Sequence, residues 1–215
     1  MSKVITAVLV AMLFSTVAAQ GQTGRHVSLG IGVGVHKYVD DSFSRKNPGV
    51  SLLYRLAWSI KTKDGWTWEP RAGLDMASTN FGSSVGGSDI HIGKLRAIPI
   101  MAGIGRSYRH GRVKAGISIE AGPSFNHFAI DGSARRAYQD RLGIDLESVT
   151  AKNSLAVRPG TSIWYDLSSR LGLHGSVGYF YNRPTTTTTA GGTASSEKWK
   201  TDYVSFSAGF AVGVF

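Results

Sequence analysis

The sequence predicts an all-β protein, an eight-stranded antiparallel up-and-down β-barrel that spans a membrane. Three observations predict this fold class. An export signal is followed by no apolar run long enough for a membrane helix, eight segments alternate apolar and polar residues, and long connections alternate with short ones. Only helices and closed barrels satisfy every backbone polar group in lipid, so a membrane protein without such helices must be a barrel.

The first 19 residues have the order of a secretory signal peptide. Lys3 precedes an apolar run over residues 4–14, and Val17-Ala18-Ala19 forms the expected cleavage site before Gln20. The run is too short to span a bilayer as a helix. We expect cleavage, in preference to a membrane anchor or a buried helix, which leaves residues 20–215 as one barrel domain.

The first four strands are predicted where apolar and polar residues alternate with a period of two. In the first, Val27, Leu29 and Ile31 share one face, and Gly30 and Gly32 lie on the other. The next three repeat this pattern, with tryptophan on the apolar face of the third. These four strands are expected at residues 27–36, 50–60, 66–76 and 98–105.

The last four strands repeat the alternation, with Trp164 as an exception on the polar face. Strands of about ten residues have the length that a tilted transmembrane strand needs. The polar face is rich in glycine and serine, which would weaken a soluble sandwich but fit the narrow interior of a small barrel. These strands are expected at residues 113–122, 155–164, 171–179 and 204–214.

The connections supply independent evidence, because they alternate in length. The short ones lie at 61–65, 109–112 and 166–170, whereas the long ones lie at 37–49, 77–94, 124–153 and 183–200. Short periplasmic turns and long extracellular loops are typical of outer-membrane barrels. The short turns also keep paired residues on one face. The expected pairs are Thr62 with Trp66 (Gly65 left-handed), Tyr108 with Val113, and Asp166 with Arg170.

Aromatic residues gather on the apolar face beside the short turns. Trp58, Trp66 and Trp68 flank the first turn, and Tyr108 and Tyr165 flank the other two. Aromatic side chains at that level form the girdles of membrane barrels. A tryptophan-rich soluble core is the alternative, but it does not explain why the aromatics gather near turns.

With these features the chain, over about residues 24–215, resembles the outer-membrane β-barrel domain family, in the layout of the outer membrane protein A-like transmembrane domain. Its C-terminal strand, residues 203–215, resembles the signal read by the barrel assembly machinery: Gly209, then outward Val212 and Val214, then a terminal aromatic. Phe215 departs from the family pattern because it is out of phase with the two valines. The resemblance implies that outer-membrane lipid and the assembly machinery are partners.

The polar face carries nine charged residues that the alternation places inside the barrel. Buried charges must be paired, so a salt-bridge network that fills the interior is the favoured interpretation. A narrow solute path lined by charged rings is the alternative. The nine are Arg55, Glu69, Arg71, Asp75, Lys114, Glu120, Arg158, Asp166 and Arg170.

His174 and Ser176 are spaced as in an outer-membrane lipid A deacylase. Here the alternation points both inward, away from lipid, and no acidic partner lies nearby in the sequence. We therefore expect no catalytic residues. The histidines show no metal-ligand spacing, the glycine-rich strands lack the full nucleotide fingerprint, and no cofactor is expected.

The remaining signals concern the long connections and the charge. Residues 133–142 are expected to form a short surface helix, whose Arg135, Arg136 and Arg141 either meet lipopolysaccharide phosphates or form a solvated face, and residues 185–189 a flexible polar loop. The net charge of +10 favours anionic lipid or polysaccharide over nucleic acid in an exported protein. We expect a non-enzymatic envelope protein with a structural or surface-interaction role. A narrow solute channel is the alternative, and a lipid A-modifying enzyme is a third.

Overall fold

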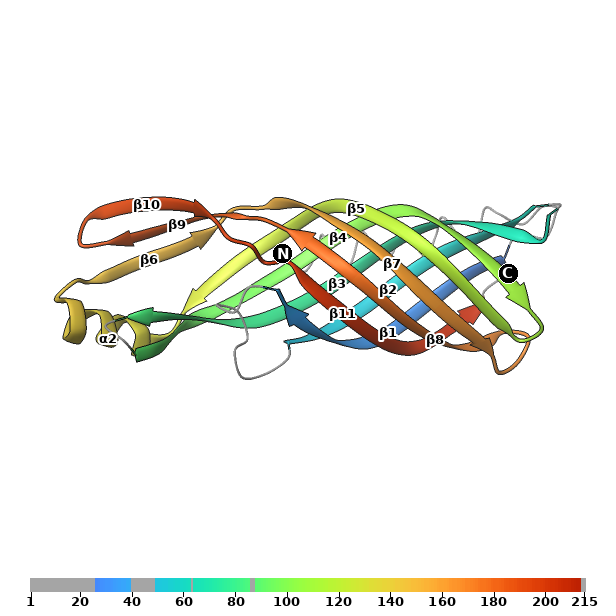
Figure 1. Cartoon of the computed structure of the whole chain (residues 1–215), viewed down its shortest axis with the longest axis horizontal. Helices are drawn as coiled ribbons and strands as arrows, with labels where there is room; N and C mark the ends of the chain where they lie inside the picture. The colour runs from blue at the N-terminus through green and yellow to red at the C-terminus, as the bar shows by residue number, and fades with distance from the viewer. Residues whose placement is uncertain (1–25, 40–48, 63, 86–87, 214–215) are drawn as a thin grey trace, which may run out of the picture.

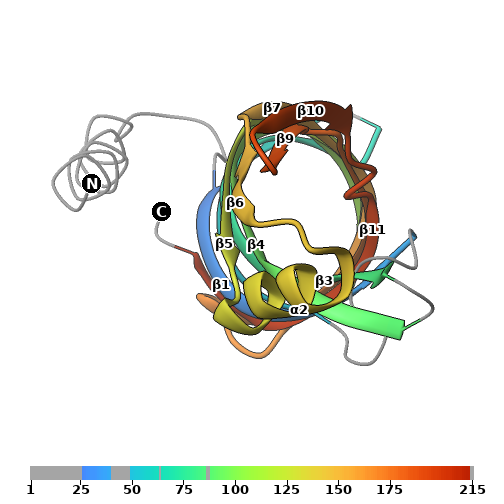
Figure 2. The same ribbon diagram turned by 90° about the vertical axis from the view of Figure 1, so that its left-hand side faces the viewer.

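The computed structural model describes residues 26–39, 49–62, 64–85 and 88–213. The expected signal peptide and the phase of Phe215 lie outside these residues. Within them, eight antiparallel strands close into one barrel in the order β1-β11-β8-β7-β5-β4-β3-β2 (Figure 1). Viewed along the barrel, the strands form a complete ring (Figure 2). The predicted fold class is confirmed.

Seven of the eight barrel strands begin within one residue of the predicted position, whereas the fourth begins ten residues earlier, at Ser88. Most strands extend further at the end with the long connections. Strands β3 and β4 continue through the segment that was expected to be a loop at 77–94, so that prediction is wrong. The barrel strands are β1 (His26–Tyr38), β2 (Gly49–Lys61), β3 (Trp66–Val85), β4 (Ser88–His110), β5 (Val113–Ile130), β7 (Ser154–Asp166), β8 (Leu171–Asn182) and β11 (Tyr203–Gly213).

The two longest connections fold into an extension beyond the end of the barrel. It consists of α2 (Gly132–Leu142), β6 (Leu146–Ala151), β9 (Thr185–Ala190) and β10 (Thr193–Lys198), and the strands form a sheet in the order β10-β9-β6. Long connections face the exterior of the cell, so we call these four elements the extracellular extension (Figure 1).

The expected helix at 133–142 is confirmed as α2, whereas the expected flexible loop at 185–189 is wrong. That threonine run is strand β9, because β-branched residues favour extended backbone and the strand pairs on both edges. Gly191 and Gly192 both have positive φ, 55° and 74°, which gives a tight turn between β9 and β10.

The short turns keep the predicted faces, although two of the three pairings are shifted. Thr62 donates its amide to the Trp66 carbonyl at 2.8 Å, and Gly65 has φ 81°, as predicted. Tyr108 pairs with Ala115 and not with Val113, because the turn is at residues 111–112. The pairing of Asp166 with Arg170 is also wrong, since Asp166 pairs with Gly172.

The outer surface of the barrel is an apolar band. Outward residues such as Val33, Ile117, Leu155 and Ile163 are more than half exposed, and they belong to strands on different sides of the ring. Among the residues that the structure describes, no helix is long and apolar enough to cross a membrane. The alternation predicted from the sequence therefore separates an apolar exterior from a polar interior.

Candidate functional site

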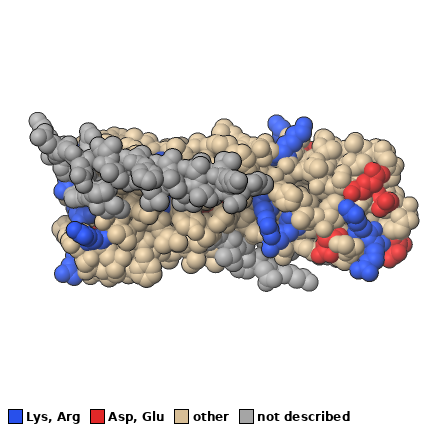
Figure 3. Space-filling model, turned by 180° about the vertical axis from the view of Figure 1, so that it is seen from behind, with Lys and Arg blue, Asp and Glu red and all other residues tan. Residues whose placement is uncertain are grey.

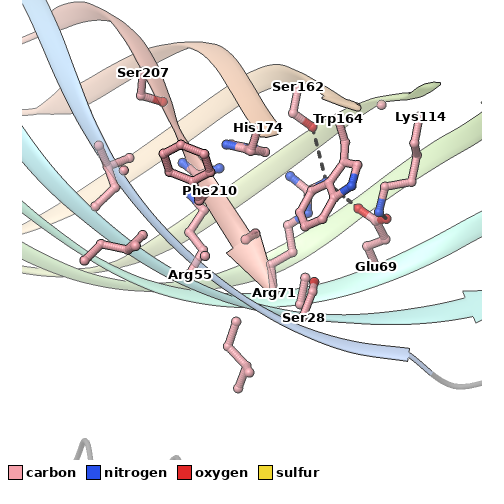
Figure 4. Close-up of a pocket in the computed structure, with 18 of the residues that line it drawn as sticks. Ser28, Arg55, Glu69, Arg71, Lys114, Ser162, Trp164, His174, Ser207 and Phe210 are labelled. Carbon is pink, nitrogen blue, oxygen red and sulfur yellow. Dashed lines mark hydrogen bonds and ion pairs between the residues drawn. The ribbon is translucent and has the colours of Figure 1, made fainter. Parts of the chain in front are cut away.

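A cluster of polar side chains lies inside the barrel toward the short turns, and we call it the lower cluster. Its members are Glu69, Arg71, Ser107, Lys114 and Ser162, and Figure 4 shows most of them. Glu69 on β3 accepts hydrogen bonds from Arg71 at 2.5 Å, from Lys114 at 2.7 Å and from Ser107 at 2.9 Å. Arg71 also reaches the hydroxyl of Ser162 on β7 at 3.4 Å. One buried carboxylate therefore holds two cations, and its contacts join β3 to β4 and β5 across the interior.

Four charged side chains form a second group further from the turns, which we call the central quartet. Arg55 on β2 lies 3.8 Å from Glu120 on β5, and Arg158 on β7 lies 3.8 Å from Asp75 on β3. Arg158 and Glu120 are also register partners on adjacent strands. At 3.8 Å these are ion pairs without hydrogen bonds, so the quartet is held less tightly than the lower cluster.

A cavity lies inside the barrel between these groups (Figure 4). Its lining includes Arg55, Arg71 and Lys114, the carboxylate of Glu69, and His174. The Trp164 indole, which the sequence places on the polar face, also lines it and lies 5.1 Å from the Lys114 ammonium in a cation–π contact. About 60 Å³ is open to the centres of water-sized molecules, which is room for a few waters or a small ion.

An aromatic layer lies in the interior between the central quartet and the extracellular extension. It consists of His36, Tyr38, Phe180 and Tyr203, which are all buried. The Tyr203 ring stacks on Phe180 with centroids 4.6 Å apart, and it contacts His36 at 4.6 Å and Tyr38 at 5.2 Å. These side chains come from both sides of the β1–β11 seam and from β8, so they occupy the lumen with apolar surface.

A second aromatic contact lies beyond this layer, toward the extracellular extension. Phe81 stacks on Trp199 with centroids 4.2 Å apart, and Phe128 meets Trp199 edge-on at 5.4 Å. Leu146 and Val149 of β6 belong to the same buried core. The extension is therefore anchored on the barrel by a hydrophobic core that continues into the barrel and includes Tyr38, Phe180 and Tyr203.

Seven of the nine residues expected inside the barrel belong to the lower cluster or the central quartet. Asp166 lies at the periplasmic rim, where it accepts hydrogen bonds from Arg109 and from the Trp164 indole, both at 2.6 Å. Arg170 lies in the turn before β8 and is exposed. Arg170 was expected inside as the register partner of Asp166, but Asp166 pairs with Gly172 and Arg170 stays in the turn.

His174 and Ser176 both point into the barrel, as the alternation predicts. His174 lines the cavity, and its nearest aromatic contact is Trp164, with ring centroids 6.2 Å apart. Ser176 accepts from Arg158 at 3.4 Å and shares a hydrogen bond with Ser207 at 2.6 Å. These contacts occupy the serine with interior partners and place neither group against the lipid.

The aromatic layer is the part of the interior that the sequence analysis did not identify. Its residues follow directly from the parity of the strands once these are extended: Tyr38 continues the inward face of β1, and Phe180 that of β8. The signal was present as large apolar residues on the polar face. The predicted strands include His36 but end before Tyr38 and Phe180, so the layer could not be assembled from them.

A basic patch lies on the outer surface where the apolar band ends. On β4, the outward residues change from Ile98 to Arg96 and Lys94, and His127 of β5 is the register partner of Arg96. All three members of this patch, Arg96, Lys94 and His127, are exposed. Figure 3 shows basic side chains toward both ends of the barrel surface and the acidic ones gathered at the extension.

Among the residues that the structure describes, no group of three or more histidine and acidic side chains could hold a metal ion. The interior arrangement can hold charges in place and exclude large solutes.

The closed ring, the apolar outer band and the charged, side-chain-filled interior define an outer-membrane β-barrel protein with eight strands. The outer membrane protein OprG from Pseudomonas aeruginosa has a similar fold, with 12% identity, a TM-score of 0.59, and 90% of this chain and 98% of that chain covered. Outer membrane protein AlkL is similar at 16% identity and a TM-score of 0.54, covering 91% and 92%.

These likenesses concern the fold. No protein-family model matches the chain, and no curated protein matches it.

Proposed function

We propose that this protein is a non-enzymatic, non-conducting component of the outer membrane, which anchors in lipopolysaccharide and presents the extracellular extension as an interaction surface. The observation that carries the proposal is the aromatic layer around Tyr203. It places four buried, mutually packed side chains in the lumen between the extension and the charged interior, so we expect no continuous aqueous path.

The extension supports the interaction role because it is folded and built to face solvent. It packs on the hydrophobic core that continues into the barrel, and every residue of β10 is exposed at the edge of the three-stranded sheet. Its surface is polar, with threonine, serine and charged residues. A rigid polar surface loses less entropy on binding than a flexible loop does, so it suits recognition of a partner outside the cell.

The basic patch supports the lipopolysaccharide anchor. Arg96, Lys94 and His127 begin where the apolar band ends, which is the level of the lipid A phosphates in the outer leaflet. Arginine and lysine bind phosphate through charge-assisted hydrogen bonds. The ion pairs found among the described residues use neither of these two cations.

The non-conducting role is tested in planar bilayers. Wild-type protein, with its insertion verified by protease protection, is expected to give no discrete current steps, whereas a general porin in the same bilayer gives them. Reproducible unitary steps from the wild type would favour the rival proposal, a narrow solute channel that uses the charged interior.

The anchor is tested by refolding the protein in vesicles of phosphatidylcholine with and without lipopolysaccharide. Lipopolysaccharide is expected to raise the unfolding temperature of the wild type and of Arg109→Gln, which alters a cation at the opposite end. The double variant Lys94→Gln/Arg96→Gln should lose most of that rise. An equal rise in all three proteins would contradict the anchor.

Two further parts of the proposal have direct tests. Lipid A mass spectra from cells with and without the protein should be identical, since His174 and Ser176 face the interior; a new lipid A species would overturn the non-enzymatic role. We also propose that the barrel assembly machinery recognises strand β11. Shortening that strand from its C-terminal end should leave the exported chain in the periplasm, and normal insertion of the shortened chain would contradict this.

A further inference from the structure

The interior of the barrel carries more positive than negative charge at the level of the apolar band. Among the described residues, the lower cluster and the central quartet contain four cations and three carboxylates. The central quartet balances itself, with two of each. The imbalance therefore lies in the lower cluster, where Glu69 alone faces both Arg71 and Lys114.

Two guanidinium nitrogens in this region have no hydrogen-bond partner among the described residues. They are Nη2 of Arg55 and Nε of Arg71, and both atoms are buried. The Arg71 side chain is only 8% exposed and that of Arg55 is 16% exposed. A buried cationic donor without an acceptor is costly, because burial removes the water that would otherwise solvate it.

Both arginines line the cavity described above, together with Lys114 and the hydroxyls of Ser28, Ser162 and Ser207 (Figure 4). Its lining thus combines three cations, one carboxylate that is already shared between two of them, and several hydroxyl donors. Its open volume of about 60 Å³ is several times the 10–15 Å³ that holds one water, and it is too small for a sugar or a lipid headgroup.

We propose that this cavity is a binding site for one small monovalent anion, a halide or a small carboxylate such as formate. The anion supplies the missing negative charge of the lower cluster, and it accepts hydrogen bonds from the buried nitrogens of Arg55 and Arg71 that lack a partner. Binding of one anion makes the interior electrically neutral, and it links β2 and β3 through the side chains of Arg55 and Arg71.

The site is tested with a matched pair of variants at Ser162, which lines the cavity and accepts from Arg71. Ser162→Asp supplies a carboxylate inside the cavity and should replace the anion, whereas Ser162→Asn has nearly the same shape and no charge. Thermal unfolding is measured in detergent micelles at constant ionic strength, while gluconate, which is too large for the cavity, is exchanged for chloride or for formate.

Wild type and Ser162→Asn are expected to gain several degrees in unfolding temperature, with a saturable dependence on the small anion. Ser162→Asp should show a flat response and should already be more stable than Ser162→Asn in gluconate. Chloride and formate are separate arms, and the arm that saturates at the lower concentration identifies the preferred anion. Equal responses of the two variants would overturn the proposal.

A direct measurement keeps the proposal falsifiable if a variant does not fold. The chloride-35 NMR line of a solution containing wild-type micelles should broaden relative to empty micelles, and millimolar formate should reverse the broadening by competition. No excess broadening together with no formate effect on unfolding would exclude the site. This outcome is independent of the bilayer and lipopolysaccharide experiments, which concern the lumen as a path and the outer surface.

Discussion

The ammonium of Lys114 on β5 lies 2.7 Å from Oε1 of Glu69 on β3, and strand β4 runs between them. The contact therefore spans the inside of the barrel and is not a neighbour pair along one edge. Glu69 is 1% exposed, and its other oxygen is occupied by Arg71. Each of the two cations depends on this carboxylate for its charge partner.

Replacement of Glu69 by glutamine should accordingly destabilise the folded barrel by about 3–5 kcal/mol, since it leaves buried cations uncompensated. Urea unfolding of the refolded protein in phosphatidylcholine vesicles measures the change. The double variant Glu69→Gln/Lys114→Gln should recover part of the loss, because one of the two uncompensated cations is then gone. A double variant that is less stable than Glu69→Gln would contradict this account.

The aromatic layer supplies a second prediction. Tyr203→Ala removes a ring that stacks on Phe180 and contacts His36, and it should cost about 3–5 kcal/mol, as for other large-to-small changes in packed cores. The variant should also expose His36, which is 1% exposed in the intact protein, to modification by diethyl pyrocarbonate. Mass spectrometry of the modified peptide locates the reaction.

Phe206→Ala is the matched control for that experiment, because Phe206 lies on the same strand but faces outward and is 53% exposed. It should leave the reactivity of His36 unchanged. Equal reactivity of His36 in wild type and Tyr203→Ala would mean that the ring does not seal the lumen.

The sequence predicted the barrel and most of its interior because lipid contact imposes a strict contrast between faces. Leu29 and Ile119 are large and apolar because they face lipid, whereas their neighbours Gly30 and Glu120 face the interior. Beyond the apolar band the outward residues also become polar, as Ser78 and Asn80 do on β3, and the contrast disappears. The strands continue there, but the alternation no longer reveals them.

The exact pairings could not be read from the sequence for a different reason. A strand keeps its faces when its register with a neighbour changes by two residues. Asp166 could therefore pair with Arg170 or with Gly172 without a change of face. Only the turn geometry selects between them. The cavity was also beyond sequence reasoning, because it depends on how far the Arg55 and Arg71 side chains reach across the barrel.

The seam that closes the barrel supplies a third prediction. Gly209 on β11 pairs with Gly32 on β1, and an added Cβ at Gly209 would lie 2.2 Å from the Ile31 carbonyl oxygen. Gly209→Ala should therefore force the two strands apart, lower the yield of heat-modifiable protein and cost about 1–3 kcal/mol, as overpacking does. Gel migration before and after boiling, followed by urea unfolding, measures both effects.

Gly30→Ala on the same seam is the control. An added Cβ at Gly30 has its nearest neighbour, the Ala211 Cβ, at 3.4 Å, which is ordinary contact. This variant should fold with the yield of the wild type. Similar losses for both variants would mean that the seam tolerates no side chain at either site, and that the close approach at Gly209 has no special role.

The start of α2 in the extracellular extension supplies the last prediction, which concerns pH. Asp131 is the N-cap of the helix, and its carboxylate accepts hydrogen bonds from the Ser133 amide at 3.0 Å and hydroxyl at 2.9 Å. These bonds lower the pKa of Asp131 below its ordinary value of 3.8. The capping contribution is therefore fully present above the unfolded pKa, and it is lost as the pH falls through the lower pKa of the folded state.

Amide hydrogen exchange at Ser133 and Ala134, corrected for the intrinsic effect of pH, should accelerate as the pH is lowered below about 4, the ordinary pKa range of an aspartate. Asp131→Asn keeps an acceptor oxygen at the cap but does not titrate, so its corrected exchange should stay constant over the same range. His91, whose Nε2 lies 3.8 Å from Asp131, is replaced by glutamine in both proteins, so that the carboxylate is compared with the amide without this neighbour. A corrected exchange rate that rises equally with and without the carboxylate would show that the cap does not control this end of the helix.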